Sequence, residues 1–171
     1  MASGFDWDEM LAFLRQARFE DLLLPCHLDR DRPIPLAAPW FFTAYLATDL
    51  GYLQVRMSDD HGSLLLSVTP EVVPEEDWVQ DDNELILCSI ETQLLGSVLP
   101  ARCTGLRYWT NGESDLARGR IRCLELSFGD QTQLVLDAMR IDGIRMGTAG
   151  DAERWLDDMA GGPNTVHEWR R

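Results

Sequence analysis

The first hydrophobic pattern along the chain has the spacing of an α-helix. Apolar residues recur at positions 7, 10, 11, 14 and 17, which share one face of a helix. Asp6 precedes this run and Glu9 follows three positions later, as in a helix N-cap with its reciprocal acid. Because Pro25 cannot continue a helix, we expect the helix over residues 6–23. The three prolines and alternating charges of residues 26–39 predict an exposed connector.

Further along, apolar and polar residues alternate with the period of β-strands. Residues 52–57 and 63–69 flank a polar turn at 58–62, which predicts a β-hairpin with a five-residue loop. Residues 120–128 and 132–138 alternate around Gly129-Asp130-Gln131 and predict a second hairpin. Shorter apolar or alternating runs occupy residues 40–48, 85–90, 94–99 and 103–110, and residues 143–147 suit a short edge strand.

The connections between these elements indicate the fold class. An acidic start at Asp151 and apolar positions 155, 156 and 159 predict a short C-terminal helix over residues 151–159. Hairpin-length connections without β-α-β alternation favour an α+β fold, a mainly antiparallel sheet with an N-terminal helix and a short C-terminal helix. The 171 residues, 45% of them apolar, fit one domain over residues 1–160 and a flexible tail at 161–171, unless Trp169 docks that tail.

Charge is unevenly distributed along the chain. The formal net charge is −14, and residues 57–101 contain ten acidic residues without a single Arg or Lys. Such a field repels DNA, RNA and anionic membranes, which are themselves negative, and favours a basic protein partner. All fifteen basic residues are Arg, which is typical of a GC-rich bacterial coding sequence.

The cysteines and the N-terminus predict a cytoplasmic protein. Cys26, Cys88, Cys103 and Cys123 form no C-x-x-C pair, which argues against a zinc ribbon or a disulfide framework. We expect buried free thiols and a reducing compartment. The first residues lack the pattern of a signal peptide, and the longest apolar patch, at 36–47, is too short to span a bilayer.

The sequence offers little catalytic chemistry. His27, His61 and His167 fall in expected loops or the tail, and no pair of them has the spacing of metal ligands. The Asp59-Asp60-His61-Gly62 run could form a metal or acid-base site, but a solvated hairpin turn explains the same residues. Neither a phosphate-binding glycine loop nor a nucleophile elbow occurs. We therefore predict no enzyme, no metal site and no cofactor.

An acidic segment around Trp78 is the best candidate for a binding site. Seven acidic residues lie between positions 71 and 84. They indicate either a solvated loop or a binding surface, and a tryptophan surrounded by charge resembles an interface hot spot with a polar rim. The predicted partner-binding residues, which include two acids of the first hairpin turn, are Asp59, Asp60, Glu71, Glu75, Glu76, Asp77, Trp78, Asp81, Asp82 and Glu84.

The second predicted hairpin resembles a known class of proteins. Residues 124–137 read LELSFGDQTQLVLD and are followed by GIRMG at 143–147, which is similar to the end of several small bacterial immunity-protein families. These are cytoplasmic inhibitors of secreted toxins. The resemblance implies a non-catalytic α+β binder, often acidic and often facing a basic toxin, and it transfers no binding residue.

Three functional hypotheses follow. The first is an immunity protein, or antitoxin, that neutralises a cognate secreted toxin through its acidic surface, with a nuclease or nucleic-acid deaminase as the toxin. The second is an acidic chaperone for a secreted effector, which would need an exposed apolar groove and a dimer-forming helix. The third is an enzyme built from loop acids and His61. The sequence does not set the oligomeric state.

Overall fold

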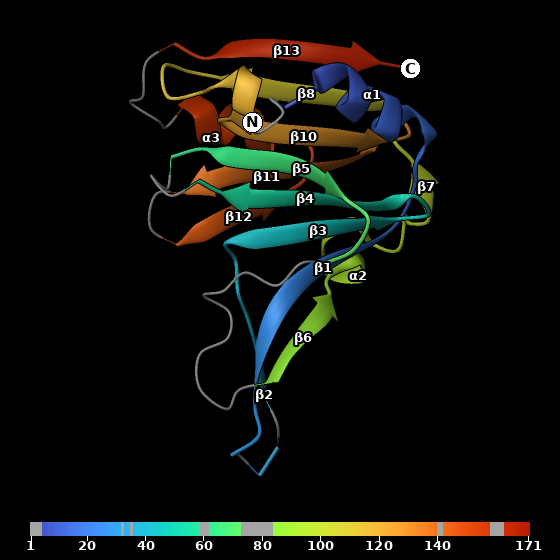
Figure 1. The fold of residues 1–171 in the computed structure, drawn as a ribbon, viewed down its shortest axis with the longest axis vertical. Helices are drawn as coiled ribbons and strands as arrows, with labels where there is room; N and C mark the ends of the chain where they lie inside the picture. Colours follow the sequence, from blue (N-terminus) through green and yellow to red (C-terminus); the bar gives the residue numbers. More distant parts are fainter. Residues whose placement is uncertain are drawn as a thin grey trace.

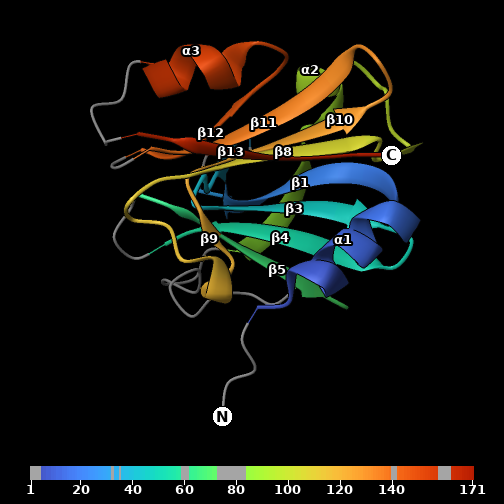
Figure 2. The same ribbon diagram turned by 90° about the horizontal axis from the view of Figure 1, so that it is seen from above.

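The protein folds as two antiparallel β-sheets that pack face to face. A computed structural model describes residues 5–31, 33–34, 36–58, 62–72, 84–139, 142–157 and 163–171. Seen from above, the sheets form two layers, with helices at the side and on the outer surface (Figure 2). The predicted α+β fold, with an N-terminal helix, a short C-terminal helix and mainly antiparallel strands, is confirmed.

The first sheet has eight strands, in the order β2-β1-β3-β4-β5-β9, with β6 and β7 paired to the other edge of β1. Its strands are β1 (Arg18–Asp29), β2 (Leu36–Pro39), β3 (Thr43–Thr48), β4 (Gly51–Met57), β5 (Leu64–Thr69), β6 (Glu84–Ser89), β7 (Ala101–Arg102) and β9 (Arg120–Ile121). The predicted first hairpin is confirmed, because β4 pairs with β5 from Tyr52 opposite Thr69 to Met57 opposite Leu64.

The second sheet has five strands, in the order β12-β11-β10-β8-β13. They are β8 (Gly105–Thr110), β10 (Cys123–Phe128), β11 (Thr132–Met139), β12 (Gly143–Gly147) and β13 (Thr165–Arg170). The predicted second hairpin is confirmed by the pairing of β10 with β11. The predicted edge strand at 143–147 is confirmed as β12, which pairs only with β11 in the described part of the chain.

The N-terminal helix is shorter than the sequence pattern predicts. Helix α1 (Trp7–Gln16) begins after Asp6, whose side chain accepts hydrogen bonds from the Asp8 and Glu9 amides, as expected of an N-cap. The expected end at residue 23 is wrong, because strand β1 already begins at Arg18. Phe19 is buried before a register shift at residues 19–21, and Leu22, Leu24 and Cys26 are buried after it, so the period of two is interrupted at the shift and then resumes.

Pro25 lies inside β1 because the strand changes partner there. On one edge β1 pairs with β3 as far as Leu23 and with β2 from Cys26 onward. Between them, the Pro25 carbonyl accepts a hydrogen bond of 2.7 Å from the Trp40 amide. At this position no strand partner would accept a hydrogen bond from residue 25. The strand therefore tolerates proline, which has no amide proton to donate.

Two further segments form strands that the sequence pattern does not predict. The expected connector at 26–39 instead contains the end of β1 and all of β2, which pair from Cys26 opposite Pro39 to Asp29 opposite Leu36. The expected flexible tail contains β13, which pairs with β8 from Thr165 opposite Thr110 to Arg170 opposite Gly105. Partners distant in sequence stabilise both strands, so local composition gives a weak signal.

Helices cover the parts of the second sheet that the first sheet leaves open. Helix α1 lies beside β5, and its Trp7 ring stacks on Tyr108 of β8 at 4.4 Å between centroids (Figures 1 and 2). Helix α3 (Asp151–Asp157) confirms the predicted C-terminal helix and packs on the outer face. A short helix α2 (Glu91–Leu95) replaces the first part of the apolar run at 94–99, and a 3₁₀ turn η2 (Leu116–Arg118) precedes β9.

The contact between α3 and β12 leaves no room for a side chain at Gly147. A Cβ atom added there would overlap the Trp155 ring and the Asp151 carboxylate of α3. We expect Gly147→Ala to lower the free energy of unfolding by about 1–3 kcal/mol, because the helix must move. Urea denaturation measures this. Gly105→Ala is the control, since its added Cβ would meet only ordinary contacts at 3.5 Å. Equal losses in both variants would contradict the packing described.

Part of the first sheet extends beyond the sandwich. Residues 26–29 of β1, together with β2 and β6, form a three-stranded ribbon that projects downward in Figure 1. We call this ribbon the arm. No described residue of the arm belongs to the main hydrophobic cluster between the sheets.

Candidate functional site

The structure describes two of the ten predicted partner-binding residues. Glu71 is exposed just after β5, and Glu84 is the first residue of β6. These positions belong to one sheet but not to neighbouring strands, because β5 pairs with β4 and β9 whereas β6 pairs with β1. The other eight lie outside the described residues, and they are Asp59, Asp60, Glu75, Glu76, Asp77, Trp78, Asp81 and Asp82.

The histidines occupy strands rather than the expected loop and tail. His27 is in β1 and His167 is in β13, while His61 lies outside the described residues. The His167 ring stacks on Tyr108 at 4.6 Å, and its Nε2 atom lies 3.1 Å from the Thr110 hydroxyl. Among the described residues, no group of three or more His, Cys, Asp or Glu side chains is placed to hold a metal ion.

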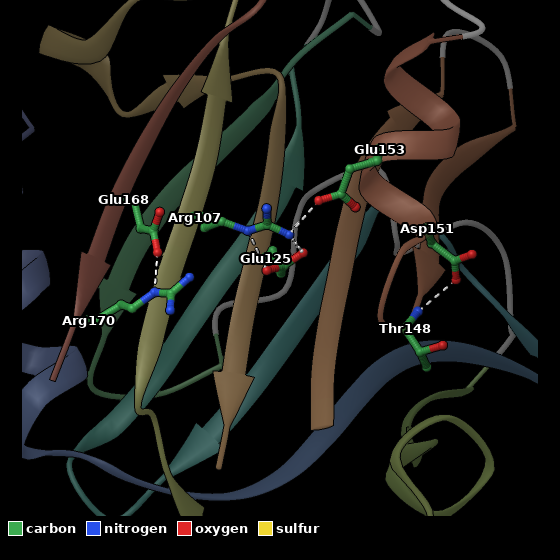
Figure 3. A network of polar contacts seen from close by, with 7 residues as sticks. All are labelled: Arg107, Glu125, Thr148, Asp151, Glu153, Glu168 and Arg170. Atoms are coloured by element: carbon green, nitrogen blue, oxygen red, sulfur yellow. Dashed lines mark hydrogen bonds and ion pairs between the residues drawn. The ribbon is translucent and has the colours of Figure 1, made fainter. Parts of the chain in front are cut away.

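A network of ion pairs occupies the outer face of the second sheet (Figure 3). The sheet register places Arg107 of β8 between Glu125 of β10 and Glu168 of β13. Arg107 donates two hydrogen bonds of 2.7 Å to the two carboxylate oxygens of Glu125, which is 1% exposed. Its Nη2 atom also lies 2.7 Å from Glu153 of α3. This fork geometry is the strongest form of Arg-carboxylate pairing.

The network shifts the pKa values of its members. Hydrogen bonding to Glu125 raises the pKa of Arg107 above its ordinary value, although burial acts in the opposite direction. Burial alone would raise the pKa of Glu153, but a backbone hydrogen bond and Arg107 outweigh it and lower that pKa. Both groups therefore stay charged at neutral pH and are poor proton donors or acceptors for catalysis.

A second ion cluster lies beside the first and is more deeply buried. Asp137 of β11 is 0% exposed and pairs with Arg122 at 2.6 Å and with Arg145 at 2.7 Å. Arg145 also lies over the Trp155 ring, 4.2 Å from its centroid. Two guanidinium groups thus neutralise one buried carboxylate, which is the arrangement expected when a charge is removed from water.

The four cysteines are free thiols, as predicted, and three of them are buried. Burial raises the pKa of Cys26 to about 12 and that of Cys103 to about 11. Burial, and next the nearby Asp137 charge, raise the pKa of Cys123 well above its ordinary value. Thiolates are the nucleophilic form, so these three side chains are unsuited to nucleophilic catalysis at neutral pH.

A polar hollow of about 390 Å³ adjoins the first ion network. It lies over β8, β10 and β13, and its lining includes Arg107, Gln133, Glu168 and Arg170. Glu168 and Arg170 pair with each other. Asp130 and Arg171 also line the hollow, so it carries charges of both signs and no single sign of charge dominates it. The sequence pattern does not predict this hollow. The available signal was a charged residue within each of three strand segments, at positions 107, 125 and 168.

No family model, curated protein or solved structure matches this chain. The functional assignment therefore depends on the residues themselves. None of the helices that the structure describes is long and apolar enough to cross a membrane.

The arm carries apolar side chains that face solvent. Ile34, which precedes β2, is 81% exposed, Leu36 of β2 is 50% exposed and Leu87 of β6 is 40% exposed. The register places Leu36 and Leu87 on the same face of the ribbon, because they lie opposite Asp29 and Pro25, which are separated by an even number of positions in β1. Strand β1 separates these two side chains, so each is an exposed apolar site on the same face of the arm.

Proposed function

We propose that this protein is an immunity protein that binds and neutralises a basic secreted toxin, with a nuclease or nucleic-acid deaminase as the toxin class. The proposal rests mainly on one observation: the excess negative charge is concentrated in residues 57–101, which contain ten acids and no Arg or Lys. A toxin that acts on nucleic acid carries a basic surface, which such a field attracts.

The distribution of ion pairs supports this proposal. In residues 102–171 the described pairs neutralise acids within the chain, as Glu125 and Asp137 illustrate. The stretch at 57–101 contains no arginine with which its own acids could pair. Its ten acids therefore give the stretch an excess of negative charge, which would attract a basic partner. In this mechanism, electrostatic attraction accelerates the encounter, and apolar contacts then slow dissociation.

We expect loss of acids in the predicted segment to weaken toxin binding. Replacing Glu75, Glu76, Asp77 and Asp81 by Ser removes four negative charges, and it should raise the Kd roughly tenfold or more at low salt. The salt dependence of association should also decrease. Surface plasmon resonance against the toxin encoded beside this gene, at two salt concentrations, measures both effects.

A matched variant separates this effect from net charge. Replacing four exposed acids elsewhere in the chain by Ser removes the same charge, and it should change the Kd less than about threefold. The four control positions are Glu9, Glu20, Asp130 and Asp157. Unchanged affinity and unchanged salt dependence in the segment variant would refute the site, and absence of any binding by the wild-type protein would refute the function.

The chaperone alternative meets a structural obstacle in α1. A chaperone of this class needs a helix available for dimerisation, but α1 buries Met10 and Leu14 against the sandwich. Light scattering and binding of an unfolded effector segment distinguish the two functions. A dimer that binds such a segment would favour the chaperone.

A further inference from the structure

One edge of strand β6 has no strand partner among the described residues. In the described part of the chain β6 pairs only with β1. The Ile90 amide, one position beyond β6, donates a hydrogen bond of 2.9 Å to the Leu22 carbonyl. Hydrogen-bonded pairs alternate along antiparallel strands, so Cys88, Ile86 and Glu84 direct their backbone groups at β1. The backbone groups of residues 85, 87 and 89 therefore point away from the sheet.

Four other edge strands carry features that discourage strand pairing, whereas the sequence of β6 contains few such features. Strand β2 is four residues long and ends in Pro39, and β9 has only two residues. Strand β13 contains Glu168 and Arg170, and the β12 amide of Ile144 already donates to the Phe41 carbonyl. Strand β6 reads ELILCS, with no proline, no basic residue and one acid at its first position. Proteins usually protect such edges, so an unprotected one indicates a docking site.

We propose that β6 accepts a β-strand of a basic partner protein, which extends the first sheet by one strand. This inference rests on the proposed function and identifies where the partner is held. Backbone hydrogen bonds to residues 85, 87 and 89 would align the incoming strand, and its apolar side chains would cover the exposed Leu87.

Charge identifies the occupant as a basic strand rather than a second copy of this protein. Strand β6 lies inside the stretch that contains ten acids and no Arg or Lys. Two copies paired through β6 would bring two such stretches together, which like-charge repulsion disfavours. A strand that alternates Lys or Arg with apolar residues would match both the apolar face and the field.

The probes are fluorescein-labelled octapeptides, one of alternating Lys and Val and one of alternating Glu and Val. By fluorescence anisotropy we expect the full-length protein to bind the Lys peptide at least about tenfold more tightly than the Glu peptide. On binding the Lys peptide, the amides of Leu85, Leu87 and Ser89 should become protected from hydrogen exchange in NMR spectra. The amides of Ile86 and Cys88 should be protected already in the free protein.

Leu87→Pro tests the edge directly. It removes an outward-pointing amide and no hydrogen bond to β1, and it should weaken Lys-peptide binding at least about tenfold. Val166→Pro is the control, because the hydrogen bond from the Arg171 amide to the Thr104 carbonyl places the Val166 amide on the outward side of β13. It should leave binding unchanged. If Leu87→Pro fails to fold, Leu87→Lys places a positive charge on the edge and should weaken binding to a similar degree.

Several outcomes would overturn the inference. They are equal affinity for the two peptides, binding without protection of residues 85, 87 and 89, equal loss in Leu87→Pro and Val166→Pro, and a homodimer that Leu87→Pro dissociates.

A toxin-protection assay in cells separates this inference from the proposed function. If Leu87→Pro protects as well as wild type, strand addition is refuted and the immunity function stands. If wild type binds the Lys peptide with the expected protection pattern but neutralises no neighbouring toxin, the immunity function is refuted and strand addition stands.

Discussion

Asp137→Ala should lower the free energy of unfolding by about 3–5 kcal/mol, because it leaves buried positive charge without a counterion. Asp137 is 0% exposed, and it accepts hydrogen bonds from Arg122 at 2.6 Å and from Arg145 at 2.7 Å. Arg122 is almost as deeply buried, so water cannot replace the lost carboxylate. Urea denaturation at pH 7 gives the change directly.

A solvent-exposed pair provides the control for this prediction. Glu168 and Arg170 form an ion pair on β13, and both side chains are substantially exposed. Glu168→Ala should cost no more than about 1 kcal/mol, because water screens the pair. If the two variants lose similar stability, Asp137 does not hold a buried cluster. Asp137→Asn, which keeps the shape and removes the charge, should fall between them.

Phe19→Ala should also lower the free energy of unfolding by about 3–5 kcal/mol, because it opens a cavity between the sheets. The Phe19 side chain is 0% exposed, and its ring meets the Phe128 ring of the opposite sheet at 5.4 Å between centroids. The same denaturation experiment measures the loss. Leu50→Ala is the control, because Leu50 lies exposed after β3 and its truncation should cost less than about 0.5 kcal/mol.

The Phe19 result also tests where the N-terminal helix ends. In a helix over residues 6–23, Phe19 would lie on the face opposite to Met10 and would not join the buried stripe that contains Met10 and Leu14. In the strand it faces the core next to Leu22, after the shift in register. A loss below about 1 kcal/mol would contradict the placement of Phe19 in β1 and in the core.

The sequence predicts hairpins well because their signals are local. The turn residues Gly129 to Gln131 and the alternation on both sides lie within a few positions of each other, and the strands pair as predicted. The same holds for β4 and β5 around the turn at 58–62. In each case the partner of a strand is its immediate neighbour in the chain, so local pattern is sufficient.

Prediction from the sequence pattern fails for strands whose partners are distant in the chain. Residues 18–23 fall within the predicted helix because Pro25 is the first residue that cannot continue it, whereas pairing with β3, β6 and β7 makes them a strand. Strand β13 looks like a polar tail because its partner β8 lies some fifty-five positions away. Long-range contacts of this kind leave no trace in a local window.

The candidate surfaces were accessible to sequence analysis only in part. Acid segregation is visible by counting, and it led to the segment at 71–84. The sequence pattern does not predict the arm, because it places residues 26–29 and β2 in an exposed connector and β6 in an isolated apolar run. The Arg107–Glu125 and Asp137–Arg122 pairs were also missed, since register alone determines which charged residues of different strands meet.

In the proposed complex, the arm would keep partner recognition apart from the residues that stabilise the fold. Its described side chains lie outside the hydrophobic cluster that holds the sandwich together, although β1 runs without interruption from one region into the other. Substitutions at exposed arm positions such as 36 and 87 can therefore alter the surface of the arm at small cost in stability. As the proposed partner changes in sequence during evolution, compensating substitutions could accumulate on the arm. The residues that stabilise the sandwich would stay the same.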